Sequence, residues 1–89
     1  MGKDLTFTQS AWNEYMEWQR QDKKIANKIN ELIKSIQRTP FEGIGKSEPL
    51  KENLSGLWSR EITKKHRIVY KVEEGCTKII QVENHYNDK

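Results

Sequence analysis

Five aliphatic side chains between residues 25 and 36 constrain the fold of this chain more than any other feature. They follow the spacing i, i+4, i+7, i+8, i+11 and are Ile25, Ile29, Leu32, Ile33 and Ile36. That spacing puts them on one side of an α-helix, and such a helix must bury its apolar side against another layer. Asp22 stands where an N-cap belongs, and Pro40 cannot continue a helix. The sequence therefore predicts a helix from Asp22 to Arg38 or Thr39.

The segments on either side of this helix carry weaker patterns. Residues 4–8 alternate polar and apolar side chains, which is typical of a short, half-buried strand. Ser10 can cap a first helix, in which Trp12, Tyr15 and Met16 recur at helical spacing. Three strand-like segments complete the pattern, at residues 57–62, 66–72 and 78–86.

A segment rich in proline and glycine, residues 40–56, separates the second helix from those strands. It predicts one long loop with a short turn of helix near residues 49–52. Loops longer than about 12–15 residues in small domains are usually functional. The predicted element order, β-α-α-β-β-β, indicates one domain over residues 1–89 and an α+β fold. In that fold, two N-terminal helices pack on one face of a mainly antiparallel sheet.

Length and composition exclude several classes of protein. A chain of 89 residues has room for a single small core. No apolar run approaches the roughly 20 residues that cross a bilayer, and the N-terminus lacks a secretory signal, so we expect a cytoplasmic protein without membrane contact. Cys76 is the only cysteine and is expected in a turn. With His66 and His85 as the only histidines, no familiar zinc spacing exists, and we expect neither a metal nor a cofactor.

Positive charge is concentrated in the middle of the chain. The whole chain carries a formal charge of +3, whereas residues 46–71 alone carry +4, from seven basic and three acidic side chains. A basic block on a small domain is typical of a partner that is a polyanion, most often nucleic acid.

The predicted strands bring several ionisable groups together, among which Glu48, Arg60, Arg67 and His85 are candidates for chemistry. If residues 66–72 and 78–86 pair as a hairpin, paired positions sum to about 149, which puts Arg67 near positions 82–83 and His85 just beyond the end of the hairpin. The long loop can close over the same end. A carboxylate, a guanidinium and an imidazole at one place could cleave RNA without a metal. Each of them is equally compatible with an ordinary surface charge.

A series of short motifs, in order along the chain, is similar to one known family. They include Thr39-Pro40-Phe41-Glu42-Gly43, Glu48-Pro49-Leu50-Lys51, Asn53-Leu54-Ser55-Gly56, Trp58-Ser59-Arg60, His66-Arg67, Val69-Tyr70 and His85-Tyr86. Together with residues 28–34 they cover nearly the whole chain, which closely resembles the YoeB toxins, the Txe/YoeB branch of the RelE-like toxin superfamily.

The resemblance implies a microbial-RNase-like fold and a ribosome-dependent endoribonuclease, an mRNA interferase that cleaves mRNA in the ribosomal A site and so inhibits translation. It implies that Glu48 is the general base, that Arg67 stabilises the phosphate and that His85 is the general acid. It also implies that Tyr86 helps to place the substrate and that Lys51 contacts RNA.

The resemblance further implies partners. These are the ribosome with its RNA, a YefM-like antitoxin of a type II toxin–antitoxin pair, a second copy in a homodimer, and operator DNA only through the antitoxin complex. The chain departs from the family pattern in two places. Glu61 stands where the family often has arginine, and Asn87, Asp88 and Lys89 extend beyond the usual terminal tyrosine.

A second function remains open at this stage. The basic block 46–71 could dock on ribosomal RNA and stop translation by occupancy, without cleaving anything. Both functions would block protein synthesis, and the residues alone do not separate them.

Overall fold

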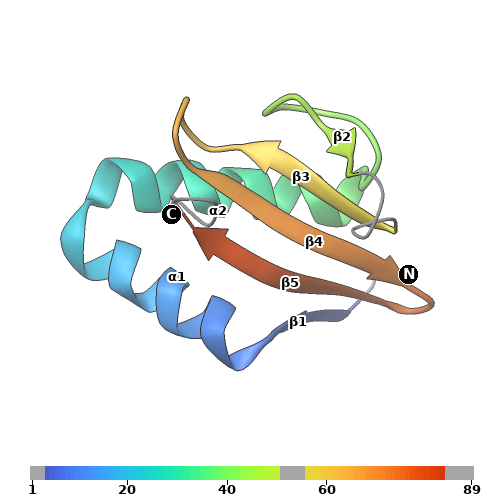
Figure 1. Cartoon of the computed structure of the whole chain (residues 1–89), viewed down its shortest axis with the longest axis horizontal. Coiled ribbons are helices and arrows are strands. Elements are labelled where there is room, and N and C mark those ends of the chain that lie inside the picture. The colour runs from blue at the N-terminus through green and yellow to red at the C-terminus, as the bar shows by residue number, and fades with distance from the viewer. Residues whose placement is uncertain (1–3, 51–55, 84–89) are drawn as a thin grey trace.

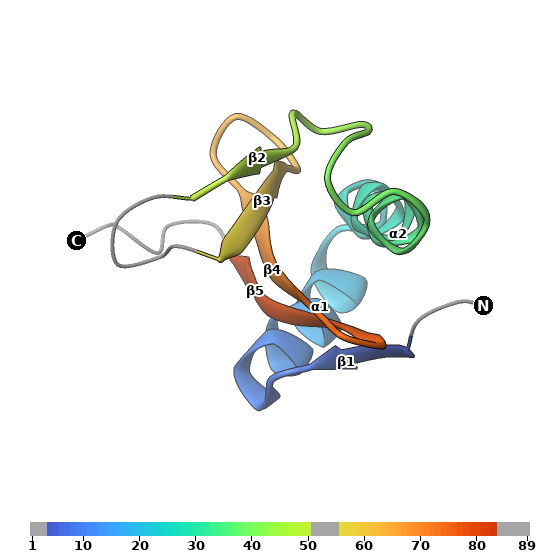
Figure 2. The same cartoon turned by 90° about the vertical axis from the view of Figure 1, so that its right-hand side faces the viewer.

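A five-stranded sheet carries two helices on one of its faces (Figures 1 and 2). The computed structural model describes residues 4–50 and 56–83. The elements are β1 (Asp4–Phe7), α1 (Gln9–Gln21), α2 (Lys23–Arg38), β2 (Glu48–Pro49), β3 (Leu57–Glu61), β4 (Arg67–Glu73) and β5 (Cys76–Glu83). The strand order across the sheet is β1-β5-β4-β3-β2. This arrangement confirms the predicted α+β fold.

Three of the four strand pairs are antiparallel, and β1 runs parallel to β5. In the β4–β5 hairpin, Arg67 pairs with Glu83, and the paired positions there sum to 150. An irregularity at Val69/Tyr70 shifts the register so that Tyr70 pairs with Ile79, a sum of 149. The predicted hairpin register is therefore confirmed to within one residue.

The predicted apolar stripe of α2 forms the centre of the core. Asp22 caps this helix, since its side chain accepts a hydrogen bond from the Ile25 amide at 3.2 Å. Thr39 follows the last helical residue, Arg38, as predicted. The fully buried apolar side chains come from both helices and from β4 and β5, and they are Ala11, Ile29, Leu32, Ile36, Ile68, Tyr70, Ile79 and Val82. Burial of these side chains holds both helices against the sheet.

Some local predictions were wrong. Thr8, and not Ser10, caps α1, because β1 ends one residue before Thr8 and the Thr8 hydroxyl accepts from the Ala11 amide at 3.1 Å. Cys76 begins β5 and pairs with Glu73, so the turn consists of the two residues before Cys76.

The long loop also differs from its prediction. Glu48 and Pro49 form β2, an edge strand, where a turn of helix was expected to begin. Proline is tolerated at a sheet edge, since a ladder hydrogen bond from its nitrogen is not needed there. Residues 51–52 of the predicted helical turn lie outside the described residues, as do residues 84–86 of the last predicted strand. Within residues 4–50 and 56–83, no helix is long and apolar enough to span a membrane.

Candidate active site

The sheet face opposite the helices gathers three polar side chains from neighbouring strands. Ser59 on β3 pairs with Glu48 on β2 and with Val69 on β4. Arg67 lies two residues before Val69 and therefore on the same face, because side chains alternate along a strand and paired residues share a face. The register of three strands thus brings together Glu48, Ser59 and Arg67, although they come from distant parts of the sequence.

Within residues 4–50 and 56–83, the guanidinium of Arg67 makes one hydrogen bond and lies near one carboxylate. Its Nη1 donates to the Ser59 hydroxyl at 2.9 Å, and the same nitrogen lies 3.6 Å from Oε2 of Glu48. The side chains of Arg67 and Glu48 are 32% and 54% exposed. The Nε and Nη2 groups of Arg67 make no hydrogen bond within the described part of the chain. A guanidinium carries five N–H donors, so this one keeps donors available to an anionic ligand.

The segment leading to Glu48 is attached to β3 by a backbone bond and an ion pair. The Glu61 amide donates to the Gly45 carbonyl at 2.6 Å, and Nζ of Lys46 lies 3.5 Å from Oε1 of Glu61. Lys46 adopts a positive φ of 52°, which completes the turn toward β2. At the position where the resemblance led us to expect arginine, the acidic side chain thus has a lysine partner.

Side chains of α1 hold the end of β5 that pairs with Arg67. Trp18 donates from Nε1 to the Val82 carbonyl at 3.1 Å, and the carboxylate of Glu14 accepts from the Val82 amide at 2.8 Å. These bonds connect the first helix to the strand position just before Glu83. Sequence reasoning missed them, because Glu14 and Val82 are separated by 68 residues.

Three predicted site residues lie outside the described residues. These are Lys51, His85 and Tyr86, and their roles stay predictions. The described part of β5 ends at Glu83, which pairs with Arg67 and precedes His85 by two positions in the sequence.

Arg60, a candidate for chemistry in the sequence, is completely buried on the helix side of β3. Strand alternation was the available signal, since it puts Arg60 on the same side as Trp58 and Ile62. Ser59 was missed as the hydrogen-bond partner of Arg67, since hydroxyl groups on strands carry no distinctive pattern.

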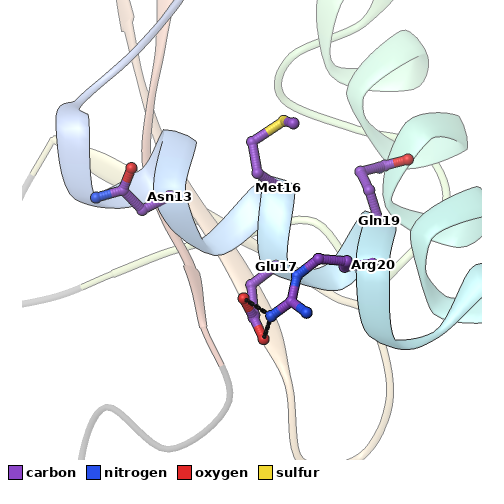
Figure 3. Close-up of a pocket in the computed structure, with 5 residues that line it drawn as sticks. All are labelled: Asn13, Met16, Glu17, Gln19 and Arg20. Carbon is purple, nitrogen blue, oxygen red and sulfur yellow. Dashed lines mark hydrogen bonds and ion pairs between the residues drawn. The ribbon is translucent and has the colours of Figure 1, made fainter.

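A shallow pocket lies on α1, the helix that packs against β5 and β1 (Figure 3). Its lining residues are Asn13, Met16, Glu17, Gln19 and Arg20. Hydrogen bonds from Arg20 and Gln21 lower the pKa of the Glu17 carboxyl, and the same contact with Glu17 raises the pKa of Arg20. The pocket thus carries a neutralised ion pair, and it is separate from the Glu48–Arg67 pair. Over the described ranges, no cluster of three or more His, Cys, Asp or Glu residues is placed to hold a metal.

Comparison with known proteins assigns the chain to a family. A family profile described as "YoeB-like toxin of bacterial type II toxin-antitoxin system" matches residues 7–86. The chain is 54% identical to Toxin YoeB of Escherichia coli K12 over 82 residues, which cover 92% of this chain and 98% of that protein.

Solved structures agree with the sequence comparison. A YoeB/ParE toxin from Agrobacterium tumefaciens is 46% identical, with a TM-score of 0.87 over 93% of this chain and 99% of that one. The YoeB dimer from Staphylococcus aureus is 47% identical, with a TM-score of 0.86 over 94% and 98% of the two chains. The same toxin has also been solved as a heterotetrameric complex of YoeB with YefM. This protein therefore belongs to the YoeB family of toxins from bacterial type II toxin–antitoxin systems.

Proposed function

We propose that this protein is a ribosome-dependent mRNA interferase, an endoribonuclease that cleaves mRNA in the ribosomal A site and so stops translation. The observation that carries the proposal is the pairing of an available guanidinium, Arg67, with a half-exposed carboxylate, Glu48, at 3.6 Å on the sheet face opposite the helices. Membership of the YoeB family gives this pair its context.

The proposed reaction is a transesterification within the RNA chain. Glu48 takes the proton of a ribose 2′-hydroxyl, and the resulting oxygen nucleophile attacks the adjacent phosphorus. Arg67 stabilises the negative charge that develops on the phosphate oxygens. His85 gives a proton to the 5′-oxygen that leaves, so the products are a 2′,3′-cyclic phosphate and a 5′-hydroxyl.

The contacts of the pair support these roles. A carboxylate that abstracts a proton has to be reachable by the substrate, and the side chain of Glu48 is 54% exposed. The donors of the planar Arg67 guanidinium that are not used within the described residues can bind two oxygens of a phosphate. In the same proposal Tyr86 helps to place the nucleotide and Lys51 contacts the RNA backbone.

The proposed partners follow the same family context. A relative from S. aureus has been solved as a dimer and in complex with YefM, and we expect this chain to form a homodimer and to be inhibited by a YefM-like antitoxin. Its other proposed partners are mRNA on the ribosome, ribosomal RNA, and operator DNA through the antitoxin complex. The proposed location is the cytoplasm.

Primer extension on mRNA from a translating extract tests the proposal. The wild-type protein should create new 5′ ends at A-site codons. An mRNA with a 2′-deoxy sugar at the scissile position should bind but resist cleavage, since it lacks the nucleophile. Cleavage of the deoxy substrate would refute the chemistry.

The basic segment favours one alternative, a non-catalytic inhibitor that occupies the ribosome. The basic side chains of residues 46–71, apart from the buried Arg60, can bind phosphates without catalysis. In that case translation would stop while primer extension detects no new 5′ ends.

A further inference from the structure

Arg60 uses every hydrogen-bond donor of its guanidinium inside the protein. Its Nε donates to the Tyr70 hydroxyl at 3.1 Å, and its Nη1 donates to the Ser35 hydroxyl at 2.9 Å and to the Ile44 carbonyl at 3.0 Å. Its Nη2 donates to the carbonyls of Thr39 and Glu42 at 2.8 and 2.9 Å. Five donors therefore meet five acceptors, none of which is a carboxylate.

Burying a cation without an anionic partner costs free energy of folding, so the hydrogen bonds of Arg60 have to offset that cost. Here the acceptors are mainly backbone carbonyls of residues 39–44, a segment without helix or strand structure. Tyr70 adds to them, since its hydroxyl donates to the Pro40 carbonyl at 2.6 Å. We call Arg60, Tyr70 and the carbonyls of residues 39, 40, 42 and 44 the Arg60 clasp.

The segment held by the clasp leads directly to Glu48. Gly45 accepts from the Glu61 amide at 2.6 Å, one position beyond Arg60 on β3. Gly45 also lies so close to the core that an added Cβ would stand 2.7 Å from Cδ2 of Leu32. The chain between Thr39 and Gly45 is thus attached to α2 and β3 over its whole length.

Among the described residues, few backbone bonds support the strand that carries Glu48. β2 consists of two residues, paired with Ser59 and Trp58, and the Leu50 amide adds one bond to the Leu57 carbonyl at 2.9 Å. So short an edge strand is marginal by pairing alone. The attachment of residues 39–45 is therefore what determines where β2, and with it the carboxylate of Glu48, lies along β3.

We propose that Arg60 is a positioning residue for Glu48, acting from the helix side of β3 on the general base that lies on the opposite face. The role of Glu48 in this inference rests on the proposed function. The connection from Arg60 through residues 39–45 to β2 rests on the contacts of Arg60. Arg60 itself touches no substrate, since it is fully buried.

The first test uses Arg60→Lys, which keeps the charge but replaces the planar fork by one ammonium that cannot reach all five acceptors. Amide hydrogen exchange is measured on the wild-type protein and on this variant. Exchange at Leu50 and Glu61 should become at least about tenfold faster while exchange in the β4–β5 hairpin is unchanged, as expected for local opening. Unchanged exchange at Leu50 and Glu61 would overturn the clasp, whatever the protein's activity.

The second test is a double-mutant cycle in single-turnover cleavage on programmed ribosomes, with Arg60→Lys, Glu48→Gln and the double variant. A shift of about 1 Å in a catalytic group can cost about 100-fold, so Arg60→Lys should lower the cleavage rate at saturating toxin by about 10–100-fold and leave ribosome affinity within about threefold. In the Glu48→Gln background the same change should cost less than about threefold, because the group it positions is already lost.

A core variant serves as the control for general destabilisation. Ile29→Val removes one buried methyl group of α2, away from residues 39–48. The cleavage rates are compared at temperatures where Ile29→Val and Arg60→Lys are equally folded. Under those conditions Ile29→Val should cleave like the wild type. Equal losses in both Glu48 backgrounds, or an equal loss in Ile29→Val, would overturn the positioning role. If the wild-type protein cleaves nothing, the proposed function is refuted, and the positioning role with it. The hydrogen-exchange experiment does not depend on cleavage and still tests whether Arg60 holds residues 39–45 in place.

Discussion

Arg60 and Arg67 lie on adjacent strands, on opposite faces of the same sheet, and their surroundings differ in every respect. Arg60 is completely buried and donates all five of its hydrogen bonds to neutral acceptors. Arg67 is one-third exposed, donates to one hydroxyl and stands 3.6 Å from a carboxylate. The same side chain is thus part of the framework on the helix-covered face and a candidate for chemistry on the other.

The difference shows what makes an arginine available. A guanidinium whose donors are all used cannot bind a phosphate without breaking the bonds that hold it. Arg67, whose one hydrogen-bond partner among the described residues is the Ser59 hydroxyl, is oriented and still has donors that those residues do not use. Saturation of donors, more than the presence of positive charge, therefore separates the two arginines.

The difference between the two faces is tested most strongly by removing Arg67 and Glu48 from the face opposite the helices. Arg67→Ala and Glu48→Gln should each lower single-turnover cleavage by about 100-fold or more, as expected for groups that act in the transition state. Glu48→Gln should change thermal stability little, because a partly exposed ion pair contributes about 0–1 kcal/mol. Arg67→Ala should cost more, because it also removes the hydrogen bond to Ser59, worth about 0.5–1.5 kcal/mol. Near-full cleavage by both variants would show that this face carries no catalytic pair.

The helix-covered side can be probed at Gly45, a glycine that lies against the core. Gly45 and Gly75 both have positive φ angles, of 83° and 76°, but a Cβ at Gly45 would stand 2.7 Å from Leu32, whereas one at Gly75 would meet no atom within 4 Å. Since the backbone strain is similar, Gly45→Ala should destabilise the protein by about 1–3 kcal/mol more than Gly75→Ala. Urea unfolding measures this difference, and equal losses would contradict tight packing of the segment before β2.

The smallest expected effect comes from the hydroxyl that orients Arg67. Ser59→Ala removes one hydrogen bond worth about 0.5–1.5 kcal/mol, so cleavage should fall by about 2–12-fold. In the Arg67→Ala background the same change should have no effect on cleavage, since its partner is absent. A similar loss in both backgrounds would mean that Ser59 acts on something other than the guanidinium.

Parts of the fold could be predicted because their signals are local. The stripe from Ile25 to Ile36 lies within one helix, and Asp22 and Pro40 mark its ends. The hairpin register followed from two strand-like segments around a short turn, and it placed Arg67 near positions 82–83, where the structure pairs it with Glu83. Strand pairing and the long loop made Glu48 and Arg67 candidates for one site, and the family resemblance supplied their expected roles.

The rest depended on contacts between distant residues. β2 was expected as part of a loop, since a two-residue strand has no periodicity to read and exists only through its pairing with Ser59 and Trp58. Thr8 caps α1 although Ser10 has the same capacity, because the end of β1 determines where the helix begins.

The order of both helices and of the four longer strands was determined by the sequence alone, since apolar periodicity acts over a few neighbouring residues, whereas β2 exists only through tertiary pairing. Only the tertiary structure decided which arginine is buried and which is available. Both have the same chemistry and both lie on strands. They differ because Arg60 faces α2 and the carbonyls of residues 39–44, whereas Arg67 faces Glu48.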